Sequence, residues 1–300
     1  MAALEYFETN VAVESRDSPL GRWTVARWSP PDPSPLRGIV EQIWYFDGTL
    51  ARARERLFPD GSAELIVQLD DPHCDGTTKS PERFPAVCIN GLRTGPAVVV
   101  APPGRCRVLG IRFDPFGAAA LLRSSMKHLV DVTIDVHDGI GRAAAELAER
   151  CADAVGTPSR DSAQRAAAAV STAERWLVRE LHGRATPEPA VAWAANLIRA
   201  TGGRASVDGI AREVGFPRAR LARRFDEALG VTPKRFARIV RFHRALDLLR
   251  RGEGIAGAAA SLAYHDQAHM YRDFAEFAGM TPGEFLSATH YPNTPSLAEP

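Results

Sequence analysis

The sequence has little cysteine and no recognisable metal site. Its 300 residues include four cysteines, and no two of them form a C-x-x-C pair. They are Cys74, Cys88, Cys106 and Cys151. We expect free thiols in a reducing compartment. A redox or zinc switch on Cys74 with His73 and Asp75 lacks the second pair of ligands that zinc sites usually have. We therefore predict no metal and no cofactor.

Long apolar runs are also absent. Nothing approaches the ~18 consecutive apolar residues of a membrane-spanning helix. The N-terminus carries Glu5 and Glu8 where a signal peptide has basic residues. We expect a cytoplasmic protein with no membrane partner. An apolar content of 45% is enough for two cores, and the length is typical of two domains.

The common catalytic motifs are missing as well. There is no G-x-S-x-G elbow, no P-loop, no G-x-G-x-x-G after a strand and no H-E-x-x-H. His137 lies near Asp135 and Asp138, but the alternating polar positions of 131–138 indicate a solvated strand or loop. We expect no enzyme. A catalytic N-terminal domain is the distant alternative, and it requires titratable groups gathered within hydrogen-bond reach in a pocket.

The charge of the chain is unevenly distributed. The net charge is +1 at pH 7. From Arg204 to Arg251, however, thirteen Lys and Arg stand against five Asp and Glu, a net of +8. From Glu253 to Pro300 there is one Arg against six acids, a net of −5. A localised basic region favours a selective polyanion partner over indiscriminate binding.

One phrase occurs twice at an offset of 49 residues, as LARRFDEALGVTPKRF from Leu221 and MYRDFAEFAGMTPGEF from Met270. In each copy a glycine stands where a helix ends in the left-handed conformation. A threonine then caps the next helix, and a proline occupies its first turn. These residues are Gly230, Thr232 and Pro233 in the first copy and Gly279, Thr281 and Pro282 in the second. Glu284 completes a capping box in the second copy.

A shorter helix and a tight turn precede each copy. Ser206 can cap a helix over Val207 to Val214, before a turn at Gly215. In the second copy Ile255 to Leu262 precedes a turn in which Ala263 stands where a glycine is usual. The chain therefore contains two helix-turn-helix units.

The first unit divides into an apolar face and a basic face. Its predicted core is Ile210, Val214, Leu221, Phe225 and Leu229. Arg218, Arg220, Ala222, Arg223 and Arg224 lie largely outside that core. In a helix-turn-helix module the second helix enters the major groove, where its arginines contact guanines or phosphates. Two ordinary helical hairpins with solvated arginines are the alternative. The duplicated turn, core and cap positions favour DNA binding.

The segment from Thr232 to Arg250 joins the two units and is amphipathic, which predicts one continuous helix. Its ~19 residues would span roughly 28 Å. That length is comparable with the ~34 Å between major-groove faces one helical turn apart. The helix could therefore hold both recognition helices in successive groove segments.

Four motifs in this part of the chain are specific enough to indicate a family. They are Ile210-Ala211-x-x-Val214-Gly215-Phe216, Leu221-x-Arg223-Arg224-Phe225 ending in Gly230-Val231-Thr232-Pro233, Arg241-Phe242-His243-Arg244-Ala245, and Tyr264-x-Asp266-Gln267-Ala268-His269-Met270-x-Arg272-x-Phe274. Through them the region from about Glu188 to Leu286 resembles the DNA-binding domain of the AraC/XylS family of bacterial transcription regulators. The resemblance implies double-stranded DNA and RNA polymerase as partners.

The resemblance and the basic face together predict the DNA contacts. In the first unit they are Arg218, Ala219, Arg220, Ala222, Arg223 and Arg224, and in the second Gln267, Ala268, His269, Tyr271 and Arg272. Arg241 is predicted to contact a phosphate. Because phosphate neutralisation supplies much of the affinity, we expect the first unit and the linking helix to anchor the protein. The acidic second unit then adds sequence preference or meets a protein partner.

The front part of the chain is strand-like. Short apolar segments separated by Pro and Gly predict a small β-sandwich or barrel. These segments cover 39–46, 63–69, 97–100 and 105–113. Asp114 is predicted to cap a helix that runs to Leu122, with Pro115 in its first turn. Further helices are predicted over 140–154 and 162–181.

Three motifs give this front part a resemblance too. They are Trp44-Tyr45-Phe46, Leu57-Phe58-Pro59-Asp60-Gly61-x-x-Glu64-Leu65-Ile66 and Gly110-Ile111-Arg112-Phe113-x-Pro115-x-Gly117. They resemble the N-terminal domain of a subset of AraC-like regulators, which implies binding of a small-molecule effector or formation of a homodimer. The predicted pocket residues are Trp44, Phe46, Phe58, Glu64 and Arg112. The alternative is plain core aromatics with an ordinary Glu64–Arg112 ion pair.

These patterns predict an α+β protein that acts as a sequence-specific transcription regulator. A β-rich sandwich or barrel-like domain for sensing or dimerisation covers 1–155, and a helical linker segment covers 156–187. An all-α DNA-binding domain with two helix-turn-helix units joined by a long helix covers 188–288, and a flexible tail covers 289–300. The alternative for the first domain is that it binds only protein, for dimerisation or antagonist docking.

Overall fold

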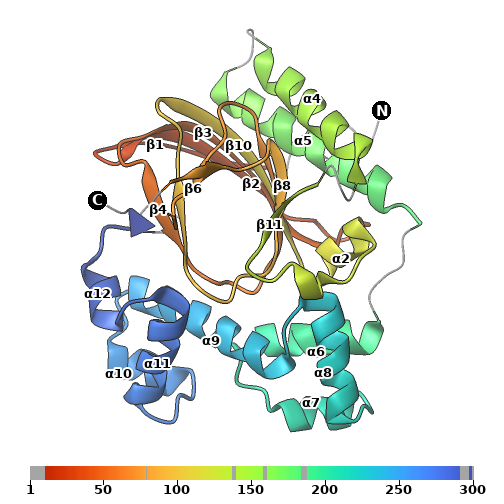
Figure 1. The fold of residues 1–300 in the computed structure, drawn as a ribbon, viewed down its shortest axis with the longest axis vertical. Helices are drawn as coiled ribbons and strands as arrows, with labels where there is room; N and C mark the ends of the chain where they lie inside the picture. Colours follow the sequence, from red (N-terminus) through yellow and green to blue (C-terminus); the bar gives the residue numbers. More distant parts are fainter. Residues whose placement is uncertain are drawn as a thin grey trace.

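The computed structural model describes residues 11–78, 80–136, 140–157, 161–183, 188–290 and 297–298. Glu5, Glu8, His137 and Asp138, which enter the sequence arguments, lie outside these ranges. A barrel of β-strands with helices on its outside sits above a helical C-terminal region (Figure 1). The predicted α+β class is confirmed. No helix in the described ranges is long and apolar enough to cross a membrane.

Two antiparallel sheets build the barrel. Within the described residues, the larger sheet has the strand order β1-β2-β3-β10-β5-β8-β11 and the smaller one β12-β4-β9-β6-β7. The strands of the larger sheet are β1 Ala12–Ser18, β2 Gly21–Trp28, β3 Val40–Leu50, β5 Glu64–Gln68, β8 Val87–Asn90, β10 Arg105–Phe113 and β11 Thr133–Asp135. Those of the smaller sheet are β4 Arg54–Leu57, β6 Cys74–Asp75, β7 Glu82–Arg83, β9 Ala97–Val100 and β12 Leu297–Ala298.

The larger sheet has different environments on its two faces, because successive side chains of a strand point to opposite sides. On β3, Ile43 and Tyr45 are fully buried in the core that the sheet shares with its covering helices. Trp44 and Phe46 point to the other face, into the barrel. The covering helices are α2 Gly117–Leu122, α4 Arg142–Gly156 and α5 Ser162–Leu181.

Helix α5 belongs to the core of the barrel domain. Its Val170 and Trp176 are buried in the same apolar cluster as the strands, and the Trp176 indole donates to the Ala143 carbonyl at 2.9 Å. The helix lies against α4 and across β2 and β3. The sequence prediction placed 156–187 between the two domains. The apolar face of α5 instead packs on the sheet.

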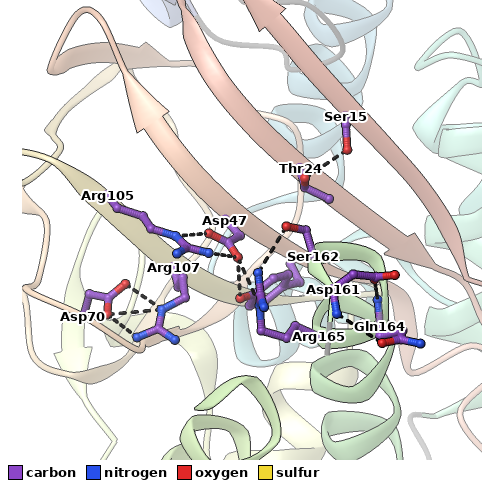
Figure 2. A network of polar contacts seen from close by, with 11 residues as sticks. Ser15, Thr24, Asp47, Asp70, Arg105, Arg107, Asp161, Ser162, Gln164 and Arg165 are labelled. Carbon is purple, nitrogen blue, oxygen red and sulfur yellow. Dashed lines mark hydrogen bonds and ion pairs between the residues drawn. The ribbon is translucent and has the colours of Figure 1, made fainter. Parts of the chain in front are cut away.

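A polar network fixes the start of α5 (Figure 2). Asp161 and Gln164 form a capping box at the first turn. The Asp47 carboxylate, buried on β3, accepts two hydrogen bonds from Arg105 of β10, at 2.6 and 2.8 Å. Arg165 of α5 lies 3.9 Å from the same carboxylate. One buried acid thus joins two strands and a helix, and removing it would leave these cations without their partner.

Seven helices follow within residues 188–290. They are α6 Pro189–Ala200, α7 Val207–Glu213, α8 Arg218–Leu229, α9 Pro233–Arg250, α10 Ile255–Ser261, α11 Gln267–Ala278 and α12 Pro282–Ser287. The predicted caps are confirmed. Ser206 and Thr232 accept backbone N–H bonds at the starts of α7 and α9, and Thr281 with Glu284 forms the capping box of α12. The glycines that end α8 and α11 are left-handed, with φ of +77° and +65°.

The predicted cap of α2 is wrong. The helix begins at Gly117, and its first N–H groups donate no hydrogen bond to a capping side chain. That carboxylate accepts from Arg199 of α6 at 3.2 Å. A contact with a helix 85 residues further along the chain therefore replaces the local cap.

The end of the chain returns to the barrel. Residues Leu297–Ala298 form β12, which pairs with β4 and is the edge strand on that side of the smaller sheet (Figure 1). Leu297 is 2% exposed and Ala298 is 5% exposed. Two residues of the predicted flexible tail are thus part of a sheet. Residues 291–296 and 299–300 lie outside the described residues.

Glu174 of α5 gives the barrel domain a dependence on pH. Its side chain is buried, and its Oε2 atom has no hydrogen-bond partner among the described residues. Burial raises the pKa of Glu174 from 4.5 to about 7, against the opposing charge of Arg175. A raised carboxyl pKa means that stability is highest below the unfolded-state pKa and is lost as the pH rises towards 7.

We therefore expect Glu174→Gln to raise the free energy of unfolding at pH 8 by roughly 1 to 3 kcal/mol. It should also remove most of the decline in stability between pH 5 and pH 7. Urea denaturation at several pH values measures both effects. The exposed Glu149→Gln on α4 is the control and should keep the wild-type profile. An unchanged decline in Glu174→Gln would contradict this assignment.

Candidate nucleic-acid interface and barrel cavity

The first helix-turn-helix unit has a buried face and an exposed basic face. Leu221, Phe225 and Leu229 of α8 are buried in the domain core. Of the predicted DNA contacts on this helix, Arg218, Ala219, Arg220 and Arg223 are exposed, and Ala222 and Arg224 are half-buried. The exposed set lies on the first turns of α8, which are the part of a recognition helix that reaches base edges.

The arginines of α8 have weak partners. Arg218 pairs with Asp208 at 2.9 Å, and Arg223 approaches Glu227 at 3.9 Å. Arg220 lies over the Phe216 ring, with its guanidinium carbon 4.1 Å from the ring centroid. Exposed ion pairs of this kind contribute only about 0 to 1 kcal/mol. These cations can therefore exchange their present partners for phosphates or bases at little cost.

The second unit presents fewer charges. On α11, Gln267, Ala268, Tyr271 and Arg272 are exposed, and His269 is half-buried with its ring edge-on to Tyr264. The side chain of Asp266 caps the helix by accepting from the His269 N–H at 2.6 Å. The exposed face thus carries one arginine together with amide, imidazole and phenol groups. Such a surface suits selective hydrogen bonding better than phosphate attraction.

Helix α9 joins the units, as predicted, in one piece. Its 18 residues span about 27 Å. Arg238 of α9 donates to Asp273 of α11 at 2.7 and 3.1 Å, and this carboxylate is only 1% exposed. The same guanidinium donates to Glu276 at 2.5 Å. A buried ion pair therefore fixes α11 relative to α9.

Arg241 of α9 differs from the other predicted contacts. It is half-buried and donates to the Gly203 carbonyl at 2.8 Å. Its guanidinium carbon lies 5.4 Å from the centroid of the Tyr264 ring. Gly203 has a φ of +75°, and a Cβ there would come within 2.1 Å of the Ala237 carbonyl. The guanidinium is thus held inside the domain, where it ties α9 to the turns before α7 and α11.

A cavity of about 340 Å³ lies inside the barrel. All five residues of the predicted pocket line it. They are Trp44, Phe46, Phe58, Glu64 and Arg112. Further lining residues that the sequence patterns missed include Trp23, Arg27, Asp60, Phe84 and Arg93. The missed residues come from β2 and from loops. Local sequence does not reveal that these segments lie beside β3 and β10.

The charges at the base of the cavity are arranged in pairs. Arg112 forms an ion pair with Asp60 at 2.5 Å and lies 3.9 Å from Glu64, its predicted partner. Glu64 accepts a hydrogen bond of 2.6 Å from the Trp44 indole. Burial raises the pKa of Glu64, against the opposing effects of Arg112 and Trp44. The nearer partner of Arg112 is Asp60, which the sequence prediction did not include.

Gly110 makes room for one wall of the cavity. It stands opposite Trp44 in the pairing of β10 with β3. A Cβ at this position would come within 2.1 Å of the Trp44 ring. Only a residue without a side chain lets the indole lie across β10 and reach Glu64.

Residues 210–288 match a family model described as a helix-turn-helix domain, and residues 29–135 match a domain of unknown function (DUF6597). The C-terminal region is an AraC-type helix-turn-helix domain. The protein is accordingly a DNA-binding transcription regulator.

Two solved structures are similar to this chain at low sequence identity. ToxT from Vibrio cholerae is 12% identical, with 93% of this chain and 98% of that chain covered and a TM-score of 0.46. The C-terminal domain of AraT, a response regulator from Geobacillus stearothermophilus, is 18% identical, covering 37% of this chain and 94% of that chain at a TM-score of 0.33. No curated protein matches the sequence. The assignment rests on the family model and on the motifs.

The barrel and the AraC-type domain share an aromatic contact. Phe58, which lines the cavity, also packs against Phe242 of α9 and Phe285 of α12, with ring centroids 6.3 and 5.9 Å away. Gly61, with a φ of +83°, brings its backbone against Phe236 of α9. In Figure 1, α9 runs beneath the barrel. The loop from Phe58 to Ser62 therefore forms part of the cavity wall and also packs against α9.

Polar contacts reinforce this junction. Arg199 of α6 donates to Glu41, Ser62 and Asp114 of the barrel domain, at 2.9, 2.7 and 3.2 Å. His243 of α9 is buried near Asp60, whose charge opposes the lowering of the histidine pKa by burial. On the other side, η1 (Met126–His128) lies against α8, and Ser125 donates to the Glu227 carbonyl at 2.8 Å. Helices α6, α8 and α9 of the AraC-type domain thus contact the barrel domain.

The turn of the second unit is strained. Ala263 has a φ of +54°, where the equivalent Gly215 of the first unit has +69°. A left-handed alanine costs about 1 kcal/mol more than glycine. The departure from the family pattern noted in the sequence therefore leaves the turn geometry intact but makes it less stable.

We expect Ala263→Gly to raise the free energy of unfolding by about 0.5 to 1 kcal/mol. Gly215→Ala should lower it by a similar amount, because a Cβ at Gly215 meets no atom within 4 Å and only the backbone strain is added. Thermal denaturation checks both. Ala260→Gly in α10 is the control and should destabilise, since it weakens a helix without relieving strain. A destabilised Ala263→Gly would contradict the strain at this turn.

Proposed function

We propose that the regulator binds one specific DNA site through both helix-turn-helix units, and that a small molecule in the barrel cavity controls this binding. The observation that carries the proposal is the pair of exposed recognition faces on α8 and α11, joined by the single helix α9. Its length of about 27 Å approaches the ~34 Å repeat of the major groove. The two faces would then occupy successive groove segments.

The two units would divide the work of binding. The net charge of +8 from Arg204 to Arg251 supports a role for the first unit in neutralising phosphates. Arg223, exposed and weakly paired, is the preferred candidate for a guanine contact. On α11, Gln267 and Arg272 are exposed side chains suited to adenine and guanine. Arg241 would position α9 between its neighbouring turns.

Control by a small molecule would act through the shared loop. A ligand in the cavity would touch Phe58 and Asp60 on one side, while the opposite sides of these residues face Phe242 and His243. A change in the loop would therefore alter the contact of the barrel with α9. Such control requires that the ligand binds the two states of this contact with different affinity, because a ligand shifts only an equilibrium whose two states it binds unequally.

A domain that binds only protein is the second candidate. Among the described residues, the large apolar side chains that are most exposed are Val132, Trp193, Tyr271 and Leu286, of which the last three lie on three different helices. A scattered distribution supports neither a large dimer face nor a docking strand. The cavity supports the ligand hypothesis more directly. Homodimers and contacts with RNA polymerase through the acidic second unit remain compatible with it.

The test is capture of genomic fragments by purified protein, with and without cell extract as a source of effector. We expect the wild type to enrich one common DNA site, since two joined recognition faces specify sequence. The control is a variant with Arg218, Arg220 and Arg223 all changed to Ala, which should lose that enrichment. Equal capture of random fragments by both proteins would reject specific recognition by the first unit.

The comparison with and without cell extract tests separately whether a small molecule controls DNA binding. A change in site occupancy that follows addition of extract, and that disappears when small molecules are removed by dialysis, supports a diffusible effector. Occupancy that responds only to the protein fraction of the extract favours the alternative of a protein-binding front domain. Either result leaves the conclusion about DNA recognition unaffected.

Arg223→Ala tests base contact more finely. If Arg223 contacts a guanine, specific binding should weaken by about 1 to 3 kcal/mol while binding to random DNA changes little. Fluorescence anisotropy with the captured site and a scrambled duplex measures the difference. Arg150→Ala on α4, an exposed arginine paired within its own helix, is the matched control and should bind both duplexes normally. Equal losses on both duplexes would show that Arg223 contacts only phosphate.

A further inference from the structure

We propose that the barrel cavity selects an anionic ligand with an apolar or aromatic body, and that Arg93 binds its anionic group. This inference rests on the proposed function, in which the cavity holds a small molecule. It names the chemical class of that molecule from Arg93, a lining arginine that, within the described residues, has no carboxylate at ion-pair distance.

Arg93 follows β8, at the edge of the cavity near Asn90 and Gly91, which also line it. Its side chain is half-buried, and within the described ranges its guanidinium has no hydrogen bond and no ion pair. Burial lowers the pKa of Arg93, and the charges of several nearby acids oppose that effect. The residue is thus a cation placed in a partly dry site without a direct partner. Such a group gains most from an anion that brings its own acceptor oxygens.

The acids around Arg93 are engaged elsewhere. Asp131 accepts two hydrogen bonds from Thr94, at 2.6 and 2.5 Å, and Asp75 accepts two from Thr77, at 2.8 and 2.6 Å. Asp60 holds Arg112 and the Ser62 N–H. These carboxylates attract Arg93 only at a distance. Their bonds would have to break before any of them could pair with it.

Glu64 is the fourth of these acids, and it accepts the Trp44 indole N–H. It already has a donor on one oxygen and Arg112 within 3.9 Å. A cationic ligand would have to compete with that arginine for the carboxylate. The lining cation without a carboxylate at ion-pair distance in the described residues is Arg93, and its position favours an anion over a cation.

The opposite walls favour an apolar body. Trp23, Trp44, Phe46, Phe58 and Phe84 line the cavity together with Val25, Leu57 and Ile66. Aromatic walls give a flat hydrocarbon body a large contact area. Arg27 also lines the cavity, but the charge of Glu14 lies close to it. A ligand of this class would place its apolar part among the rings and its anionic group at Arg93.

Three compounds of one shape test the class. They are 4-phenylbutyrate, 4-phenylbutyramide and 4-phenylbutylamine, with charges of −1, 0 and +1. Binding to the full-length protein is followed by isothermal titration calorimetry. We expect the butyrate to bind wild type at least about tenfold more tightly than the other two, because a charge-assisted hydrogen bond replaces a neutral one.

Two variants of Arg93 assign the effect. Arg93→Met should reduce butyrate affinity to that of the amide and leave amide affinity unchanged, whereas Arg93→Lys should retain part of the preference. Arg27→Met is the matched control, a second cavity arginine that has an acid beside it, and should keep the full preference. Unchanged amide binding in Arg93→Met also shows that the cavity is still folded.

Three results would overturn the proposal. They are tightest binding of the amine, equal binding of all three compounds, and equal loss for every compound in Arg93→Met. Absence of binding by all three would also reject an anion with a simple aromatic body. None of these results alters the extract-dependent capture of DNA, so failure of the ligand class is distinguishable from failure of control by a ligand.

Discussion

The packing of Phe58 between two environments is the constraint on which the arrangement of the molecule depends. One side of this ring lines the barrel cavity, and the other lies edge-on to Phe242 and Phe285 of the AraC-type domain. The neighbouring Gly61 brings backbone against α9, and Arg199 bonds to Ser62. Because close-packed interiors transmit displacement, a change at this loop cannot stay within one domain. The cavity wall and helices α9 and α12 therefore share one packed contact.

Within the AraC-type domain, α9 has a comparable role. It contacts α6, α8, α10 and α11, and its Arg238 and Arg241 bind groups on the segments at either side. The arginines that form one basic region in the sequence therefore have two different environments in the structure. Arg218, Arg220 and Arg223 of α8 are exposed, whereas Arg238 and Arg241 of α9 bind groups within the domain. Exposure, which the sequence does not give, separates the two classes.

Sequence reasoning predicted local structure well where the signal is local. The caps at Thr232 and Thr281 and the left-handed Gly230 depend on a few neighbouring residues, and they are present in the structure. It failed at Asp114, since Arg199 comes from a distant helix and replaces the cap. The five residues of the predicted pocket line the cavity, four of them from strands, but the prediction omitted Asp60 and Arg93, which reach the cavity from loops.

The sequence by itself determined the two helix-turn-helix units, the basic character of the first and the strands of the barrel, because hydrophobic period, turn residues and caps act over a few positions. Only the tertiary structure decided that α5 packs on the sheet, that the end of the chain pairs with β4 and that Phe58 belongs to both domains. It also decided which arginines are paired. These features join residues that are far apart in the chain. Their contacts depend on how whole surfaces pack together, and no short stretch of sequence specifies that packing.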